Sequence, residues 1–267
     1  MRLALFFEGT GQGVYGKKTN VSLLYESCVQ NEEQRCHLEN GPGAKFGSWF
    51  VGGAVGIGWR VIFSRARRWF EGNYERLPAT STSTKVFIFG FSRGALIARH
   101  FAAWLDKLGI EVEYLGLWDT VSASLTLTVS EECPANVRRA RHALAADEQR
   151  RMFAYLPLKP HERSVPAGHP QVEEMIFPGS HSDVGGLYED DHVLADCARD
   201  WVAEPAAMSG LKFTGAVKSI EVWHRPLLRE RLKNAKRHDS RFLISNLWGL
   251  LGWKNRIFPS WLHRINF

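Results

Sequence analysis

The sequence predicts an α/β fold of the α/β-hydrolase type, with a mostly parallel central sheet and helices on both faces. Three observations support this prediction. Short apolar segments alternate along the chain with segments of helical periodicity. The order strand, helix, strand between residues 85 and 118 implies parallel strands joined by a crossover helix. A serine flanked by glycines, Ser92, stands between the first of these strands and the helix.

Length and composition fit a single globular domain over residues 1–267. The chain has 45% apolar and 23% charged residues, which excludes a disordered protein. Its net charge of +6 favours anionic partners, a class that includes phospholipid surfaces and nucleic acid. No nucleic-acid-binding module is recognisable, so we expect no nucleic-acid partner. Ten tryptophans together with basic residues suit a membrane interface, although we expect most aromatic residues in the core.

The cysteines and the N-terminal residues indicate a protein made in the cytoplasm. The stretch Leu3–Phe7 is too short for the apolar part of a signal peptide, and no run of about eighteen apolar residues predicts a transmembrane helix. We therefore expect a cytoplasmic location in the producing cell, and export, if it occurs, without a cleavable signal. The cysteines have no zinc-ligand spacing, so we expect reduced thiols, no metal and no cofactor. They are Cys28, Cys36, Cys133 and Cys197.

The N-terminal quarter is expected to hold a strand, a flexible loop and a glycine-rich segment. Arg2–Phe7 is typical of a short buried strand, and the three glycines within Gly9–Gly13 let the backbone come close to a bound group. Residues 41–70 combine glycines, aromatic residues and arginines. This segment is either a lid over an apolar site or a loop and helix packed on the sheet edge, and the sequence leaves both interpretations open.

Two strands and the helix between them form the centre of the predicted sheet. Lys85–Phe89 is a continuous apolar strand after a polar Ser/Thr stretch. From Arg93 onward apolar residues recur at helical spacing, and Gly109 is expected to stop this helix. Val112–Trp118 is the next strand.

The second half of the chain is expected to add two helices and two strands. Asp190 or Asp191 is expected to cap the second of these helices and Pro205 to end it. The four elements are a charged helix over residues 137–153, a strand over Val172–Phe177, a helix over Val193–Glu204 and a late strand over Ser219–Trp223.

The clearest chemical signal is the segment Gly90–Ala95, which has the form G-x-S-x-G. It lies between a strand and a helix, which is the context that this motif requires. A tight turn there exposes the serine hydroxyl above the sheet, and the small flanking residues let strand and helix approach. The helix N-terminus favours negative charge beside the serine. We therefore expect Ser92 to be a nucleophile, with the backbone N–H of Arg93 as an oxyanion donor.

A serine nucleophile needs a base and an acid that orients the base. In α/β hydrolases these residues follow in the chain order Ser, acid, His. Asp119 stands at the carboxyl end of a predicted strand, where ligands bind in such sheets; its alternative role is to cap the following turn. Among ten histidines, His181 follows the strand Val172–Phe177 in a loop expected at the same edge. His224, after the late strand, is the second choice.

Two other chemistries use the loop that contains His181. Ser92 with Asp183 would form the dyad of patatin-like lipases, which needs no histidine, but such sites usually carry Asp-Gly directly. A metal-dependent hydrolase would leave the serine turn unexplained, so we expect no metal. Its ligands would be His181, Asp183, Asp191 and His192.

Several sequence blocks resemble the DUF2235 family, the catalytic domain of Tle1-type phospholipases delivered by type VI secretion. The combination is far more specific than any one block, and it spreads over residues 1 to about 215. The main blocks are Phe6–Gly11, Gly90–Ala95, Leu117–Val121 and His181–Gly186, with weaker ones at Arg141–Ala145, Asp147–Glu148 and Leu194–Cys197.

The resemblance implies an α/β-hydrolase fold with a catalytic triad of Ser92, Asp119 and His181. It also implies phospholipid as the substrate, a membrane surface as a partner, and a secretion-apparatus delivery protein and an immunity protein as further partners. Effectors of the family often carry further membrane-binding or delivery regions, and little room for them remains after residue 215.

The first loop is expected to complete the oxyanion hole through Gly9 or Thr10, beside the Arg93 N–H. This loop departs from the family at two positions. Glu8 stands where the family usually has Asp, and Gln12 stands near the usual place of an Asn.

Residues 225–267 are expected to be a C-terminal appendage that docks on anionic bilayers. Aromatic rings can sit at headgroup depth while basic groups meet lipid phosphates. A terminal helix pair packed on the sheet is the alternative. The residues concerned are Trp248, Trp253 and Trp261, interleaved with Lys254, Arg256 and Arg264.

Three functions therefore compete. The first is a phospholipase of the A type, which cleaves acyl esters at a membrane surface. The second is a soluble esterase or acyltransferase that acts on small acyl substrates. The third is an inactive domain that binds lipid or serves as an adaptor. The presence of Ser92, Asp119 and His181 together argues against the third.

Overall fold

A computed structural model gives the fold of the chain. It describes residues 1–10, 17–41, 58–74, 84–121, 127–162, 171–214, 230, 232–239, 256–259 and 263–264.

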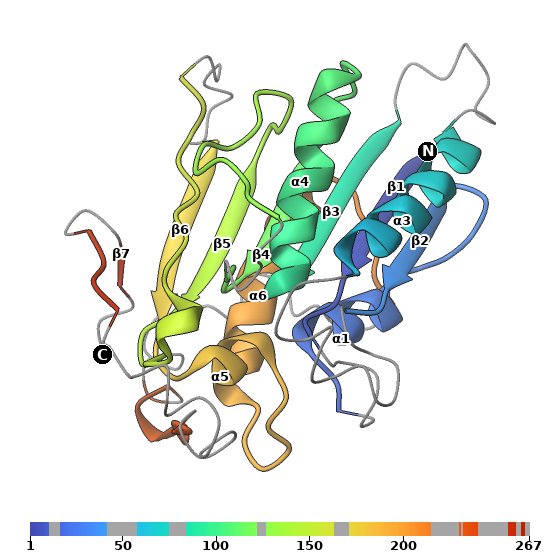
Figure 1. The fold of residues 1–267 in the computed structure, drawn as a ribbon. Helices are drawn as coiled ribbons and strands as arrows, with labels where there is room; N and C mark the ends of the chain where they lie inside the picture. The colour runs from blue at the N-terminus through green and yellow to red at the C-terminus, as the bar shows by residue number, and fades with distance from the viewer. Residues whose placement is uncertain are drawn as a thin grey trace.

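The described residues form a seven-stranded sheet in which every neighbouring pair of strands is parallel. The strand order is β2-β1-β3-β4-β5-β6-β7, and Figure 1 shows β7 at one edge of the sheet. The predicted α/β-hydrolase-like fold with a mostly parallel sheet is therefore confirmed. The strands are β1 (Arg2–Phe7), β2 (Gln34–Glu39), β3 (Lys85–Phe91), β4 (Tyr114–Trp118), β5 (Ala140–Ala145), β6 (Val172–Phe177) and β7 (His263–Arg264).

The strand order reverses between β1 and β3. From β1 the chain moves outward to β2, and it then returns to the other side of β1 to form β3. Such a switch point opens a crevice beyond the carboxyl ends of the two strands, where ligands bind in open α/β sheets. In this chain the residues that leave β1 and β3 are Glu8 and Ser92.

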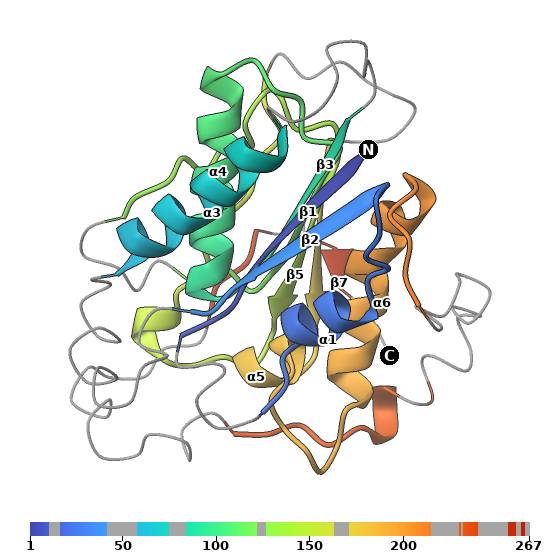
Figure 2. The ribbon, with the colours of Figure 1, turned by 90° about the vertical axis from the view of Figure 1, so that its right-hand side faces the viewer.

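Helices cover both faces of the sheet, as Figure 2 shows. One face packs against α3 and α4, and the other packs against α1, α5 and α6. The alternation of side chains along each strand produces this division, because successive residues point to opposite faces. The helices are α1 (Asn20–Ser27), α3 (Trp59–Tyr74), α4 (Arg93–Lys107), α5 (His181–Gly185) and α6 (Val193–Met208), with a 3-10 turn η1 at Arg151–Phe153.

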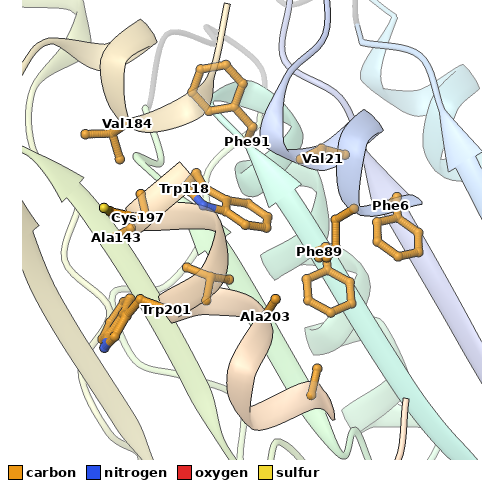
Figure 3. Close-up of a cluster of buried hydrophobic side chains, with 14 of the residues drawn as sticks. Phe6, Val21, Phe89, Phe91, Trp118, Ala143, Val184, Cys197, Trp201 and Ala203 are labelled. Carbon is orange, nitrogen blue, oxygen red and sulfur yellow. The ribbon is translucent and has the colours of Figure 1, made fainter. Parts of the chain in front are cut away.

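Large aromatic side chains dominate the core between the sheet and α1 and α6. Phe6 of β1 stacks on Phe89 of β3 with ring centroids 4.8 Å apart. Figure 3 shows these rings with Trp118 of β4 and Trp201 of α6 in the same cluster. The carboxyl ends of the central strands therefore pack against a layer of buried aromatic side chains, which suits residues that must be held in fixed positions.

The predicted helix over residues 137–153 is wrong. The central part of this segment is β5, and all six of its residues are buried. Its charged side chain is paired: Arg141 donates to Glu204 at 2.6 Å and lies over the Trp201 ring at 4.8 Å. Because such partners allow a charged residue inside a buried strand, the sequence of β5 lacks the apolar pattern by which a buried strand is recognised.

Pro205 does not end α6, contrary to prediction, because the helix continues to Met208. A proline inside a helix removes the N–H that would bond to the carbonyl four residues earlier. Here that carbonyl belongs to Trp201, and it accepts a hydrogen bond from Arg141 Nη1 at 2.7 Å instead. At the start of α6, Asp191 accepts the Val193 N–H at 2.9 Å.

Most other predicted elements are present, with small changes of length. The strand Val172–Phe177 is confirmed residue for residue, and α4 stops where Gly109 adopts a left-handed φ of 67°. The sequence did not predict α1 or β2. The part of segment 41–70 from Trp59 onward is helix α3, which buries Ile62 and Phe70 against the sheet. Residues 42–57 and the predicted strand Ser219–Trp223 lie outside the described residues.

The four cysteines are buried free thiols, and contact with Cys36 together with burial raises the pKa of Cys28. In the part of the chain that the structure describes, no helix combines the length and the apolar character needed to cross a membrane.

Gly94→Ala should destabilise the fold by about 2 kcal/mol or more, because overpacking against backbone cannot relax easily. A Cβ at Gly94 would lie 2.2 Å from the Phe7 carbonyl oxygen and 2.4 Å from that of Glu8. Gly72→Ala, in α3, is the matched control: no atom outside its own stretch of helix lies within 4 Å of the added Cβ, and it should gain about 0.5–1 kcal/mol. Denaturant unfolding of both variants measures the difference, and equal stabilities would contradict the packing described here.

Candidate active site

Ser92 occupies a strained turn between β3 and α4. Its φ of 58° and ψ of −124° are unfavourable for a residue with a side chain. The Ser92 N–H donates to the Trp118 carbonyl at 3.0 Å, so the turn is attached to β4. A Cβ at Gly90 would lie 2.7 Å from Ala95 Cα, which shows how close strand and helix come. The serine is therefore presented at the carboxyl edge of the sheet, as the motif predicts.

Asp119 follows β4 directly, one strand away from Ser92. Its backbone is also unusual, with a φ of 39°. The Asp119 N–H donates to the Ala143 carbonyl at 2.7 Å, and its Oδ1 accepts the Ala145 N–H at 3.0 Å. The carboxylate is thus fixed at the ends of β4 and β5 and is almost completely buried.

His181 begins the short helix α5, where the sequence predicted a loop. Its Nδ1 lies 2.6 Å from Asp119 Oδ2. The imidazole is held between two aromatic rings: Phe91 stacks on it at 4.6 Å, and Phe153 meets it edge-on at 4.8 Å. The structure therefore brings Asp119 and His181 together, and it packs the residue before Ser92 against the histidine ring.

The Ser92 hydroxyl does not bond to His181 in the described structure, since none of the hydrogen bonds among the described residues joins the two groups. The contact between Phe91 and the imidazole nevertheless places the histidine beside the serine turn. In unliganded sites the bond between nucleophile and base is often long, and it tightens when substrate binds.

The electrostatic environment keeps Asp119 ionised and His181 neutral. Burial raises the pKa of Asp119, but the Arg256 guanidinium and the His181 hydrogen bond together lower it by more than burial raises it. The pKa of Asp119 therefore lies below its usual range. Burial lowers the pKa of His181, and the bond to Asp119 offsets only part of that effect. A buried carboxylate beside a neutral imidazole is the combination that a general base requires.

The expected oxyanion donors meet at the switch point, but one of them is occupied. A Cβ at Gly9 would lie 3.3 Å from Ser92 Cβ, so this loop touches the serine. The Gly9 N–H, however, donates to Glu8 Oε2 at 3.2 Å. The Arg93 N–H, which directly follows Ser92 at the start of α4, remains the first candidate.

Glu8 has a structural role in the first loop. Its two carboxylate oxygens accept the Thr19 hydroxyl at 2.7 and 2.8 Å, which connects the end of β1 to the N-terminus of α1. Burial raises the pKa of Glu8 despite these hydrogen bonds. The longer side chain, in place of the usual Asp, thus reaches the cap of α1. Gln12 lies outside the described residues.

Asp183 belongs to the framework of the loop. Its carboxylate accepts the Ser180 N–H at 2.8 Å in a capping box, and its other oxygen lies 2.6 Å from His238 Nδ1. It makes no bond to Ser92 within the described ranges, which removes the geometric basis for a Ser–Asp dyad. Asp183 and His181 also point to different partners, and no group of three potential metal ligands is present in the described part of the chain.

Two residues that support Asp119 were not anticipated from the sequence. Arg256, assigned to a membrane-docking tail, has a buried side chain that contacts the Asp119 carboxylate with two nitrogens. It is therefore unavailable for lipid phosphates. Trp248, Trp253 and Trp261 lie outside the described residues. No local pattern distinguishes Arg256 from its basic neighbours, so the sequence held no signal for this contact.

The second such residue, His142 of β5, fixes the backbone just beyond Asp119. The Thr120 N–H donates to His142 Nε2 at 3.0 Å, and His142 Nδ1 lies 2.8 Å from Glu174 Oε1. Because a backbone N–H can only donate, Nε2 is the acceptor and Nδ1 carries the proton. This tautomer connects the turn after β4 to β6.

The sequence matches a family model. The model of the T6SS phospholipase effector Tle1-like catalytic domain matches residues 1–111 and 109–205, which is more than half of the chain. The chain belongs to this family. The matched residues include Ser92, Asp119 and His181, but not Arg256. No curated protein matches the chain at a significant level.

Several solved structures are similar to this Tle1-like chain. An uncharacterized protein from Pseudomonas aeruginosa has a TM-score of 0.54 and 18% identity, over 87% of this chain and 50% of that protein. A Tle1 effector bound to the VgrG spike of the type 6 secretion system has a TM-score of 0.47 and 19% identity, over 70% and 51%. The NocB thioesterase domain from the nocardicin cluster has a TM-score of 0.42 and 15% identity, over 78% and 94%. The chain thus spans about half the length of the first two proteins.

Asp119→Asn should lower turnover by about 10⁴-fold, because an amide presents the wrong partner to His181. It should also lower stability, since Arg256 loses its counterion. Asp183→Asn removes an acceptor for Ser180 and His238, so it should cost about 1–3 kcal/mol of stability and much less turnover. Ester hydrolysis and thermal unfolding of both variants measure these effects. If Asp183→Asn has the larger effect on turnover at unchanged stability, Asp119 is not the acid that orients His181.

Proposed function

We propose that this Tle1-like chain is a serine hydrolase that cleaves phospholipid acyl esters, as a phospholipase of the A type. The observation that carries the proposal is the bonded pair of Asp119 and His181 at the same sheet edge as the strained Ser92 turn. Family membership adds the substrate class, because the family is one of phospholipase effectors.

In the first half of the reaction, Ser92 Oγ attacks the acyl carbonyl carbon while His181 Nε2 takes the hydroxyl proton. Asp119 accepts the Nδ1 proton of His181 in a hydrogen bond, which fixes the tautomer and stabilises the imidazolium. The oxyanion is stabilised by the N–H of Arg93 at the N-terminus of α4 and by the N–H of Thr10 in the loop after β1. When the tetrahedral intermediate collapses, the lysophospholipid alkoxide leaves with the proton from His181.

In the second half, water replaces the leaving group. His181 removes a proton from the water, which attacks the Ser92 acyl ester through a second tetrahedral intermediate. The fatty acid then leaves, and His181 returns the proton to Ser92 Oγ. The chain's own residues supply the nucleophile, the base and the oxyanion donors that this sequence of steps requires.

Arg93 favours a phosphate-containing substrate over a neutral ester. The residue directly follows Ser92 and is only 9% exposed. Burial lowers its pKa to about 10, and its Nη1 has no hydrogen-bond partner among the described residues. A buried guanidinium nitrogen without a partner is unfavourable, and a phosphodiester beside the scissile ester would provide one.

The remaining parts of the proposal follow from the family. They are a phospholipid membrane surface as the site of action, a secretion-apparatus delivery protein and an immunity protein as partners, and cytoplasmic synthesis followed by export through that apparatus. A soluble esterase or acyltransferase would use the same triad. Hydrolysis that rises sharply when the substrate assembles into vesicles distinguishes the phospholipase from these alternatives.

Ser92→Ala should reduce hydrolysis by about 10⁶-fold with the fold intact. Incubation with vesicles of mixed phospholipids, followed by lipid analysis, measures the fatty acid and lysophospholipid released by the wild type and the variant. A fluorophosphonate should label the wild type at Ser92 alone. Hydrolysis by the variant near the wild-type rate, or labelling of a different residue, would show that the nucleophile lies elsewhere.

Arg93→Gln should lower kcat/KM for a phospholipid at least tenfold more than for a diacylglycerol with the same acyl chains, because a hydrogen bond to a charged group is lost. The comparison is made in mixed micelles of constant surface area. Arg93→Lys keeps the charge and should recover part of the preference. An equal loss on both lipids would show that Arg93 does not recognise the phosphate.

A further inference from the structure

Arg256 is built into the site by every donor that it has. Its guanidinium carries five N–H groups, and the structure shows five hydrogen bonds. Nη1 donates to Asp119 Oδ1 at 2.5 Å and to the Ala145 carbonyl at 3.1 Å. Nη2 donates to Asp119 Oδ2 at 3.0 Å and to the Phe153 carbonyl, and Nε donates to the same carbonyl at 2.8 Å. Five hydrogen bonds to three residues hold the guanidinium in one position and one orientation.

The same contacts complete the coordination of Asp119. Each carboxylate oxygen has two lone pairs, and each accepts two hydrogen bonds. Oδ1 accepts from Ala145 and Arg256, and Oδ2 accepts from His181 and Arg256. The side chains of Arg256 and Asp119 are only 3% and 1% exposed, so water does not compete for these bonds.

Arg256 reaches two of the three groups that hold the His181 ring, the third being Phe91. It bonds to Asp119, which accepts from Nδ1, and to the backbone of Phe153, whose ring packs on the imidazole at 4.8 Å. The two contacts lie on separate segments, after β4 and in η1. Arg256 therefore fixes the spacing between them.

We propose that Arg256 is a positioning residue that acts through Asp119 to set both the orientation and the basicity of His181. The inference rests on the proposed function, because it assigns to Asp119 and His181 the roles given there.

The physical reason is the charge of the site. In a buried Asp–His pair, proton transfer from serine creates an imidazolium next to a carboxylate. Here that carboxylate already has a guanidinium partner, and both cations meet at the single oxygen Oδ2. Like charges at this separation disfavour each other. Arg256 therefore keeps His181 unprotonated to lower pH, at the expense of a less stabilised imidazolium.

Other charged groups face His181 and must be considered in any pH dependence. Glu148 accepts the backbone N–H of His181 at 3.2 Å. Arg150 pairs with Glu148 at 2.8 Å, and its guanidinium lies 3.8 Å from the centroid of the Phe153 ring. The two members of this pair have opposite effects on His181: the Glu148 carboxylate raises its pKa and the Arg150 guanidinium lowers it. Variants at position 256 leave this pair in place, so its effect is constant across the comparison.

The test is the pH dependence of Ser92 labelling by a fluorophosphonate, with kcat/KM for an ester measured alongside. The labelling rate falls at low pH as His181 becomes protonated. In Arg256→Gln the acid limb should move to higher pH by about one pH unit, because the competing positive charge is gone. In Arg256→Lys the limb should stay at the wild-type pH while the plateau rate falls about tenfold, since one ammonium cannot make five planar bonds. Arg151→Gln, an exposed charge in η1, is the matched control and should leave the limb in place.

The outcomes separate the two levels of the proposal. If the wild type is not labelled at Ser92, the proposed function fails and the role of Arg256 falls with it. If the wild type is labelled and Arg256→Gln loses rate with an unmoved acid limb, Arg256 is a structural residue only. The same conclusion follows if neither variant folds, or if Arg256→Lys shifts the limb as far as Arg256→Gln. The proposal is supported if both variants fold, Arg256→Gln moves the acid limb to higher pH, and Arg256→Lys lowers the plateau rate without moving the limb.

Discussion

The reversal of the chain at Ser92 is the constraint on which the rest of the site depends. A residue held at such a backbone conformation costs about 1–3 kcal/mol, and it persists only where the surroundings fix it. Strand and helix can meet there only because Gly90 lacks a side chain. The neighbouring Phe91 ring packs directly against the end of α5, where a Cβ at Gly185 would lie 2.1 Å from the ring. The ring therefore fixes the distance between α5 and the serine turn. The same ring stacks on His181, so the turn that exposes the nucleophile also determines where the base lies.

Two Asp–His pairs around this turn have different roles, although His181 of one pair and Asp183 of the other are close in the sequence. Asp119 and His181 are buried beside Ser92, whereas Asp183 bonds to His238 and to the start of α5. The two carboxylates are chemically identical, and only their surroundings separate a candidate catalytic group from a framework group. The proximity of Asp183 to His181 in the sequence gives no indication of this division. The register of the strands does, because Asp119 extends a strand adjacent to that of Ser92.

Elements whose role is local were predictable, and elements that depend on distant partners were not. The apolar run of β3, the glycine that stops α4 and the serine turn are all determined within a few residues. In contrast, β5 carries Arg141, whose charge is tolerated in a buried strand only because Glu204 on α6 pairs with it. The continuation of α6 past Pro205 depends on the same arginine. Arg256 is the extreme case, since its partner Asp119 lies in a distant part of the chain and its neighbours look like any basic tail.

The contact between Arg256 and Asp119 also bears on the order in which the molecule assembles. The residues matched by the family model end at position 205, so a unit cut at that boundary would contain Ser92, Asp119 and His181 but leave a buried carboxylate without its cation. During synthesis the ribosome releases Ser92, Asp119 and His181 before Arg256. The nascent site therefore reaches its full charge balance only after residue 256 has emerged and its guanidinium has paired with Asp119.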